Sequence, residues 1–487
     1  MEHQLGGSAA GDGLRLADGF RGHVIGPQDP GYDAARAVIN GSINKRPALI
    51  VRPMGAADVI DAVNLARERG LPLAARCGGH SVAGNGTVDD GILVDLSNLK
   101  GVHVDPKART VRAGGGVLVG ELDRDTQLFG LVTPSGRVTT TGIGGFTLGG
   151  GYAWTSSKYG LACDNLLSAD VVTADGRLVT ASETENPDLF WGIRGGSSNF
   201  GVVTSFEFRL YPLGPMVLGG MLIFPIDQAR SVIRGYRDYV ANSPDELGTG
   251  LVILQAPPAP FIPPELHGKP VMGMVAIYID DPANGESVVA PLRKLGKPVA
   301  DLLQPMPYTA FQALTDPFAP SGWQNYHRGL HLTGFPDAAV DTYVDYATEI
   351  ARASNPNTLV IVFRHGGAVS RVPDDAMAAG HRDAVYMAHP IACWQDPAQT
   401  NMHIDWVRRY SDAMSPYRTG GVYLNFETGG DEEKVRSGYG AGKYDRLVAL
   451  KDKWDPDNLF RVNQNVRPSR QRQSRRDAAK GLGLAAG

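Results

Sequence analysis

A histidine stands among closely spaced glycines in RCGGHSVAGNG, residues 76–86. Because glycine has no side chain, backbone N–H groups in such a stretch can converge on phosphate oxygens and form an anion nest. His80 lies inside this nest. A lone histidine is usually structural, so the spacing alone leaves a structural and a functional role of His80 equally open.

A second stretch, TPSGRVTTTGIGGFTLGGGY at residues 133–152, is equally rich in glycine. Gly142 and Gly144 begin a G-x-G-x-x-G pattern, but Thr147 stands at the third glycine position. No strand, turn and helix frame the pattern, so it does not predict a Rossmann dinucleotide site. The chain still has four glycine clusters within about 125 residues, which fits a long dinucleotide lying against several loops.

The first glycine stretch follows directly on a predicted β–α–β unit. Residues 48–51 and 71–75 are apolar strand candidates. Asp58 can cap the helix between them, and Gly70 follows the helix end. The unit therefore places the glycine-rich nest at the edge of a sheet.

Farther along, the pattern of apolar residues and glycines divides the chain into regions of different composition. Further strands are expected at 92–96, 110–113, 169–173, 177–180, 201–210, 271–279 and 359–363, and helices at 227–241 and 338–353. The turn Ala174-Asp175-Gly176 predicts a hairpin. From about residue 216 to 414 helices alternate with strands, which predicts a second domain built as a sheet backed by helices.

Composition excludes several classes of function. The chain of 487 residues is long enough for at least two domains. A net charge of −4 and a sequence pI of about 6.3 give no reason to expect a nucleic-acid partner. Three cysteines make no disulfide framework or metal motif, and no apolar run could span a membrane. The first residues show no signal peptide, so a cytoplasmic protein is expected.

The motifs together resemble a known family. RCGGHS, TTGIGGFTLGGGY, SKYGLACDNL, NPDLFWGIRGGSSNFGVVTSFEFRLYP, YLNF and KWDPDNLFRVNQN occur in the order found in the berberine-bridge-enzyme-like oxidases. These belong to the vanillyl-alcohol-oxidase superfamily, which has a PCMH-type FAD-binding domain. The match extends along the whole chain, although the middle region is supported mainly by its position.

The resemblance implies an α+β fold with an inserted domain. The expected FAD-binding domain, made of two α/β subdomains, covers 1–213 with its core at about 46–213. A substrate domain of antiparallel sheet backed by helices would cover 214–414. The segment 415–467 would return to the FAD domain, and the Arg-rich residues 468–487 would form a disordered tail.

The resemblance also implies that FAD is the cofactor, with His80 joined covalently to its 8α-methyl group. The other residues expected to bind it are Arg76, Gly78, Gly79, Ser81 and Gly84 in the first loop, Thr141, Gly142, Gly144, Gly145, Gly149, Gly150 and Gly151 in the second, and Asp164, Asn165, Asn425, Asn463 and Asn465 beyond.

Two departures from the family pattern carry information. Many relatives form a second flavin link through a cysteine, but the matching position here is Val138. A single covalent link is therefore expected, as in monocovalent bacterial members, with Cys163 as buried packing. Thr141 matches the position that controls oxygen access, and its small β-branched side chain favours oxygen as the electron acceptor.

For catalysis, Tyr152 and Tyr423 match active-site positions of the family, and either could take the substrate proton if a nearby cation helped it to ionise. The matching motifs place no histidine or acid on the substrate side. Phe426 replaces a second tyrosine that relatives often have. His365, in FRHGGAVSRV, is a weaker candidate for contacting substrate, and a structural role beside the Gly366-Gly367 turn is equally open.

These features predict an oxidase that takes a hydride from a small-molecule alcohol, such as a sugar, an aromatic alcohol or a secondary metabolite, and passes the electrons to oxygen, giving hydrogen peroxide. The alternatives are a dehydrogenase with another acceptor, an amine oxidase, and a flavin-binding protein with a decayed pocket. The expected partners are substrate and oxygen, with no nucleic acid or membrane, in a monomer or homodimer.

Overall fold

The computed structural model describes residues 14–429 and 432–473. Its first half holds two main sheets. One has the strand order β1 (His23–Ile25), β2 (Leu49–Arg52), β4 (Ile92–Asp95) and β3 (Leu73–Arg76). The other has the order β5 (Val102–Asp105), β6 (Thr110–Gly114), β10 (Val202–Arg209), β8 (Leu166–Val172) and β9 (Leu178–Ser182).

The predicted β–α–β unit is present, with one refinement. Helix α2 (Ala56–Arg69) connects β2 to β3, and β4 lies between these two strands and parallel to both. The helix begins before Asp58, whose carboxylate accepts hydrogen bonds from the backbone N–H groups of Met54 and Gly55. Gly70 ends it with a φ of 64°, a left-handed conformation that favours glycine.

The second sheet confirms the predicted alternation and hairpin. In β10, Thr204, Phe206 and Phe208 are buried while the residues between them are more exposed. Strands β8 and β9 pair in antiparallel fashion across the turn at Gly176. The helices α3 (Val119–Gln127) and α6 (Pro187–Ile193) contribute buried apolar side chains to the same core.

The large sheet is antiparallel and has ten strands. Its main path runs β15 (Ala300–Asp301), β12 (Met216–Pro225), β14 (Pro270–Tyr278), β13 (Leu247–Gln255), β19 (Leu359–Arg364), β20 (Tyr386–Trp394), β18 (Leu330–Leu332) and β21 (Arg418–Val422), while β16 (Gln304–Pro307) pairs with β12 and β17 (Gln324–His327) with β20. A further small sheet joins β7 (Leu131–Val132) to β11 (Tyr211–Pro212).

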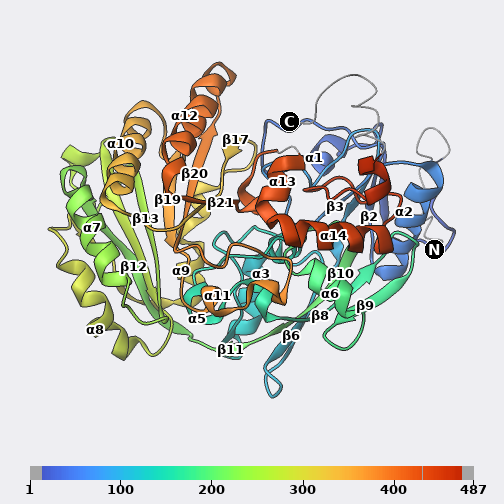
Figure 1. Cartoon of the computed structure of the whole chain (residues 1–487), viewed down its shortest axis with the longest axis horizontal. Coiled ribbons are helices and arrows are strands. Elements are labelled where there is room, and N and C mark those ends of the chain that lie inside the picture. Colours follow the sequence, from blue (N-terminus) through green and yellow to red (C-terminus); the bar gives the residue numbers. More distant parts are fainter. Residues whose placement is uncertain (1–13, 430–431, 474–487) are drawn as a thin grey trace, which may run out of the picture.

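Four long helices cover one face of the large sheet. Figure 1 shows α7 (Ala229–Val240), α8 (Pro282–Arg293), α10 (Asp337–Ala353) and α12 (Thr400–Ala413) along its outer side. Along β14, Met274 and Ala276 belong to the core shared with these helices, whereas Val275 and Ile277 belong to a cluster on the opposite face. That opposite face is directed at the first half of the chain.

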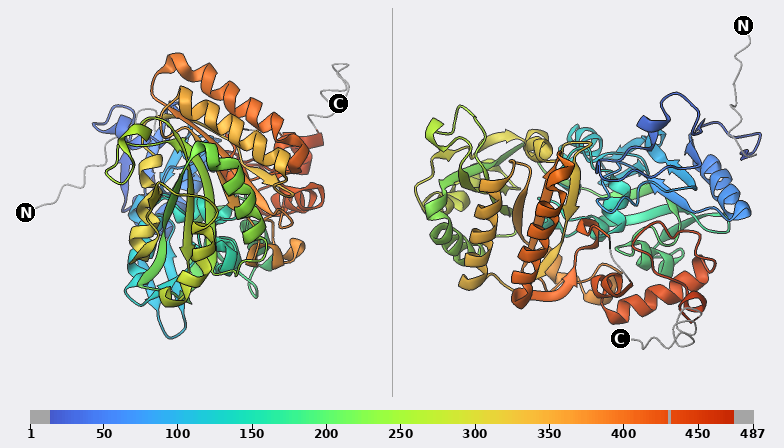
Figure 2. Two further views of the ribbon diagram at one scale, coloured as in Figure 1. Left: turned by 90° about the vertical axis from the view of Figure 1, so that its left-hand side faces the viewer. Right: turned by 90° about the horizontal axis from the view of Figure 1, so that it is seen from above.

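The C-terminal helices pack on the first half. Tyr444 and Leu447 of α14 (Ala441–Trp454) share a core with Phe190 and Phe200. In Figure 2 this red segment and the preceding α13 (Glu432–Tyr439) lie with the blue and cyan part of the chain, away from the green and yellow part. The N-terminal and C-terminal regions therefore form one half of the molecule, with the middle region beside it.

The structure departs from the sequence-based elements at three places. The glycine stretch holds a short helix, α4 (Ile143–Leu148), where none was expected. YLNF has a strand-like composition, but the strand β21 ends at Val422 and Leu424–Phe426 form a 3-10 turn. In addition, β21 pairs with β18 of the large sheet, although it lies after residue 414, the expected end of the substrate domain.

The remaining short helices connect these layers. They are α1 (Tyr32–Arg36), α5 (Ser156–Tyr159), α9 (Tyr308–Gln312) and α11 (Ala368–Arg371). In the described part of the chain, no helix is both long and apolar enough to cross a bilayer. Residues 474–487 of the expected tail, and the first thirteen residues, lie outside the described residues.

Candidate active site

A cavity of about 310 Å³ lies between the glycine-rich loops and the large sheet, on the face of the sheet opposite α7, α8, α10 and α12. Its walls come from residues 75–86 and 136–146 on one side and from β19 and β20 on the other. Residues 423–427, which follow β21, also contribute to the lining. Segments far apart in the sequence thus meet at one place.

Most of the residues expected from the sequence line this cavity. They are Arg76, Gly78, Gly79, His80, Ser81, Thr141, Gly142, Gly145, Tyr152, Tyr423, Asn425 and Asn463, together with Val138. The structure does not bring to its lining Gly84, Gly144, Gly149, Gly150, Gly151, Asp164, Asn165, Asn465 or His365.

The two glycine loops touch through their backbones. A Cβ atom on Gly78 would lie 2.4 Å from the backbone nitrogen of Gly142, and one on Gly142 would lie 2.3 Å from that of Gly78. Arg76 fixes the base of the first loop, because its guanidinium donates to the carbonyls of Ala35 and Ala37 and to Asp95. Its charge is therefore already compensated by protein groups.

His80 is held by a neighbouring hydroxyl. Its Nε2 lies 2.9 Å from Oγ1 of Thr140. Burial lowers the pKa of His80 to about 4, despite the nearby Asp316 carboxylate. The imidazole is therefore neutral near pH 7, and its Nδ1 has no hydrogen-bond partner within the described residues.

The two tyrosines differ in what their hydroxyl groups do. The Tyr423 oxygen accepts hydrogen bonds from the backbone N–H groups of Gly151 (3.0 Å) and Tyr152 (3.2 Å), and from Nδ2 of Asn425 (3.3 Å). No acceptor for its own proton occurs in the described part of the chain. The Tyr152 hydroxyl instead donates to the carbonyl of Arg364. Burial raises the pKa of both phenols, that of Tyr152 to about 12.

Histidines outside the family motifs also line the cavity. Asn325 donates through Nδ2 to the carbonyl of Trp323, so its Oδ1 must accept from Nε2 of His327 (3.2 Å). Nδ1 of the neutral His327 then accepts from Nε2 of His389 (3.3 Å). This chain leaves Nδ1 of His389 unprotonated and without a partner among the described residues.

His389 is held in a fixed orientation by a second contact. Its ring stacks on Phe426 with a centroid distance of 3.6 Å and an interplanar angle of 1°. Burial lowers the pKa of His389 well below its usual value and that of His327 to about 3. His80 further disfavours a charge on His327, and His327 and Arg137 further disfavour one on His389. Both imidazoles are therefore neutral.

The motif-based expectation of no histidine or acid on the substrate side is thus incomplete. The cavity also takes Arg137 from the second glycine loop and Glu427 from the turn after Tyr423. Glu427 accepts from Arg328 and pairs with Lys434. Single histidines on strands carry no sequence signal, since only the strand register of the large sheet brings His327 and His389 together.

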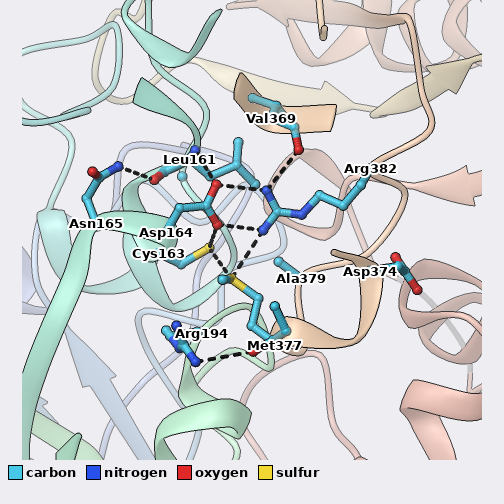
Figure 3. A network of polar contacts seen from close by, with 12 residues as sticks. Leu161, Cys163, Asp164, Asn165, Arg194, Val369, Asp374, Met377, Ala379 and Arg382 are labelled. Carbon is cyan, nitrogen blue, oxygen red and sulfur yellow. Dashed lines mark hydrogen bonds and ion pairs between the residues drawn. The ribbon is translucent and has the colours of Figure 1, made fainter. Parts of the chain in front are cut away.

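Asp164 and Asn165, also expected to contact the cofactor, form hydrogen bonds with protein groups away from the cavity lining. Asp164 accepts two hydrogen bonds from the buried guanidinium of Arg382, at 2.8 and 2.6 Å (Figure 3). Asn165 donates to the carbonyls of Tyr159 and Leu161. Cys163 is fully buried beside Met377, as expected of a packing residue.

His365 lies behind the cavity. Its ring stacks on that of Tyr152 with centroids 5.4 Å apart, and it borders a smaller cavity together with His331 and His381. Burial lowers the pKa of His365 to about 4. Its position supports the structural alternative and does not place it against the larger cavity.

Comparison with known proteins gives two matching family models. One, described as an FAD binding domain, matches residues 47–182, and the other, described as berberine and berberine like, matches residues 422–467. The first covers both glycine loops, and the second covers the turn with Tyr423 and the C-terminal helices.

Individual relatives match nearly the whole chain. (R)-6-hydroxynicotine oxidase of Paenarthrobacter nicotinovorans is 31% identical over 459 residues, which is 92% of this chain and 97% of the relative. The crystal structure of 6-hydroxy-D-nicotine oxidase from Arthrobacter nicotinovorans has a TM-score of 0.82 at 28% identity and covers 93% of this chain and 99% of that one.

A more distant solved structure shares the fold. Glucooligosaccharide oxidase from Acremonium strictum, which carries a 6-S-cysteinyl, 8α-N1-histidyl FAD, has a TM-score of 0.81 at 23% identity. It covers 92% of this chain and 97% of its own. The relatives are oxidoreductases, so a protein that only binds flavin is excluded as an alternative.

Proposed function

This chain belongs to the berberine-bridge-enzyme-like family of FAD-linked oxidoreductases in the PCMH superfamily, and we propose that it is an oxidase of small-molecule alcohols with FAD joined to His80. In the overall reaction two electrons and two protons leave the alcohol, giving a carbonyl compound, and reduce oxygen to hydrogen peroxide. FAD, when bound, supplies the hydride-accepting and oxygen-reducing chemistry.

The observation that carries the proposal is the cavity between the glycine loops and the large sheet, which holds His80 and Tyr423 in its lining. The loops fit a cofactor at close range, because a Cβ on Gly145 would meet nothing within 4 Å and the glycine therefore opens onto free space. Asn425 and Asn463 add polar groups to the same lining.

The local chemistry supports His80 as the attachment residue. A neutral imidazole can act as a nucleophile, whereas an imidazolium cannot. Since Thr140 engages Nε2, Nδ1 is the nitrogen left to form the bond. Val138 also lines the cavity and cannot form a second link, so a single covalent bond is proposed.

Tyr423 is the better of the two tyrosines as the base. Three N–H donors converge on its oxygen and would stabilise a phenolate. Tyr152 would have to ionise against the carbonyl oxygen that its hydroxyl now contacts. We therefore assign proton removal to Tyr423 and a positioning role to Tyr152.

His389 offers a second group for the same proton. Its free Nδ1 is fixed by the hydrogen-bonded chain through His327 and by the stack on Phe426. Because its burial disfavours the charged form, His389 is a weaker acceptor than an exposed histidine.

An amine is the second candidate substrate class, favoured by the match to the nicotine oxidase. A neutral amine needs less help in losing a proton than an alcohol does. Oxygen as acceptor is proposed from Thr141, whose small side chain lines the cavity. A dehydrogenase would have the same pocket but would form no peroxide.

The test is an anaerobic screen of sugars, alcohols, aromatic alcohols and cyclic amines against the purified yellow protein. Loss of the flavin absorption band would identify a substrate. Admission of air should then restore the band and form one peroxide per substrate oxidised. Restoration only by an added electron acceptor would assign a dehydrogenase, and a colourless protein would refute the proposal.

A further inference from the structure

Arg137 is a cation without a counter-ion beside the proposed site. It lines the cavity, and its Nη1 is buried without any hydrogen-bond partner. Across residues 14–429 and 432–473, no carboxylate forms an ion pair with Arg137, and the charges that would favour its charged form are those that Tyr152 and Tyr423 would carry if ionised. Burial lowers the pKa of Arg137 to about 10, so it remains charged near pH 7.

Arg76, the other arginine in the cavity lining, and the nearby Arg328 differ in this respect. Arg76 pairs with Asp95, and Arg328 pairs with Glu427. A buried charge that has no partner costs several kcal/mol, so a partner is expected from outside the protein. Arg137 therefore differs from these two arginines in lacking a carboxylate partner for its charge.

Aromatic rings fix the orientation of the guanidinium. Its Cζ lies 3.4 Å from the ring centroid of Phe363, 5.0 Å from that of Tyr152 and 5.7 Å from that of Trp154. A guanidinium stacked on a ring keeps its N–H donors in its own plane, where they can bind the two oxygens of a carboxylate. The same rings provide apolar surface for the rest of a ligand.

We propose that Arg137 binds a carboxylate of the substrate, so that the enzyme oxidises an organic acid with an apolar or aromatic body. This proposal rests on the proposed function, because it places the substrate in the same cavity. The proposal differs from a purely electrostatic role, in which Arg137 would only help Tyr423 to ionise. In that role, ligand binding would not depend on whether the ligand carries a charge.

The test uses the flavin-containing protein and ligands that are not oxidised. Benzoate, phenylacetate and 3-phenylpropionate are titrated beside their uncharged amides, with the visible flavin band as the readout. The wild type should bind a carboxylate at least tenfold more tightly than its amide. Arg137→Gln should weaken carboxylate binding about 10- to 100-fold and change amide binding less than threefold.

Two further variants complete the design. Arg137→Lys keeps the charge but loses the two-pronged geometry, so an intermediate loss for carboxylates is expected, and it serves as the test if the glutamine variant does not bind flavin. Arg230→Gln removes an equal charge from exposed ion pairs on α7 and should change nothing.

The proposal is overturned if no carboxylate binds, if carboxylates and amides bind the wild type equally, or if substitution of Arg137 leaves this selectivity intact. The outcomes of this test can be distinguished from those of the oxidase test. Oxidation of uncharged alcohols without carboxylate binding would refute the Arg137 proposal alone. Carboxylate selectivity without any oxidised substrate would refute the oxidase proposal alone.

Discussion

At the scale of single residues, the environment of His80 indicates that cofactor binding and covalent attachment depend on different groups. Thr140 occupies Nε2, and burial keeps the ring neutral. The loops around it contact each other without help from the imidazole. Binding of the cofactor and its covalent attachment should therefore be separable by substitution.

The first prediction follows from this. Wild-type protein precipitated with acid should retain its yellow colour, and a flavin-labelled peptide should contain His80. His80→Ala should fold with FAD that acid releases, because the glycine loops remain. Thr140→Val should still form the bond, since Nδ1 is unaffected. Release of all flavin from acid-treated wild type would contradict the assignment.

The second prediction concerns the two tyrosines. Tyr423→Phe should slow anaerobic flavin reduction by about 10²- to 10⁴-fold, because general-base assistance is lost. Tyr152→Phe should slow it less than tenfold, since its hydroxyl is engaged with Arg364. Stopped-flow absorbance with a good substrate measures both rates, and the flavin spectrum checks that the site is intact. If Tyr423→Phe reduces at the wild-type rate, His389 becomes the better base, and His389→Asn should be the slow variant.

The sequence predicts the cavity residues in and near the glycine motifs, but not those on the opposite wall of the cavity. His80, Thr141 and Tyr423 stand in contiguous patterns, so their presence in one cavity could be anticipated. Arg137 lies in the second loop, but nothing in the sequence shows that it lacks a counter-ion. His327 and His389 are 62 positions apart in the sequence and come together only through strand pairing, which a single sequence does not reveal.

At the scale of elements, periodic segments were predictable and irregular ones were not. The helices α2 and α10 and the strands β10 and β14 have repeating apolar patterns and appear where expected. Helix α4 lies in a glycine-rich stretch without such a pattern, and the turn of Leu424–Phe426 has strand-like composition. Tertiary contacts, such as Asn425 packed on Gly149, decide their conformation.

A buried carboxyl on α3 connects the two halves of the molecule and predicts a pH effect. Asp123 accepts from Ser135 (2.7 Å) and from Gln312 of α9 (2.9 Å). Burial raises the pKa of Asp123 to about 7. The folded protein therefore binds a proton there that the unfolded chain has lost above about pH 4.

The third prediction is that stability falls as pH rises through this window. A raised pKa in the folded state gives stability that is complete below the unfolded value and is lost above the folded one, on the order of 3 kcal/mol between pH 5 and pH 8. Asp123→Asn keeps the shape without the charge and should flatten this dependence. Urea unfolding of both proteins at the two pH values measures it, and an equal slope in the variant would rule out Asp123 as the source.

At the scale of the whole molecule, the middle region is contained between two segments that share one core. The division at residues 213 and 414 stays a prediction, because β21 joins the large sheet while the helices that follow it pack on the first half. The cavity takes residues from all of these regions. The protein should consequently depend on its C-terminal segment both to bind flavin and to fold.

The fourth prediction tests that dependence by truncation. A chain ending at Ser415 would lose Tyr423 and Asn463 from the cavity and would uncover Phe190 and Phe200, which are buried by α14. Each large apolar side chain exposed costs about 2 to 3 kcal/mol, so several together exceed the stability of a typical domain. The truncated chain should be insoluble or lack flavin. A chain ending at Gln473 should keep its flavin content and melting temperature, because the removed residues belong to the tail that composition predicts to be disordered. Flavin bound by the Ser415 chain at normal stoichiometry would show that the rest of the chain folds without the C-terminal helices and that these helices are an accessory layer.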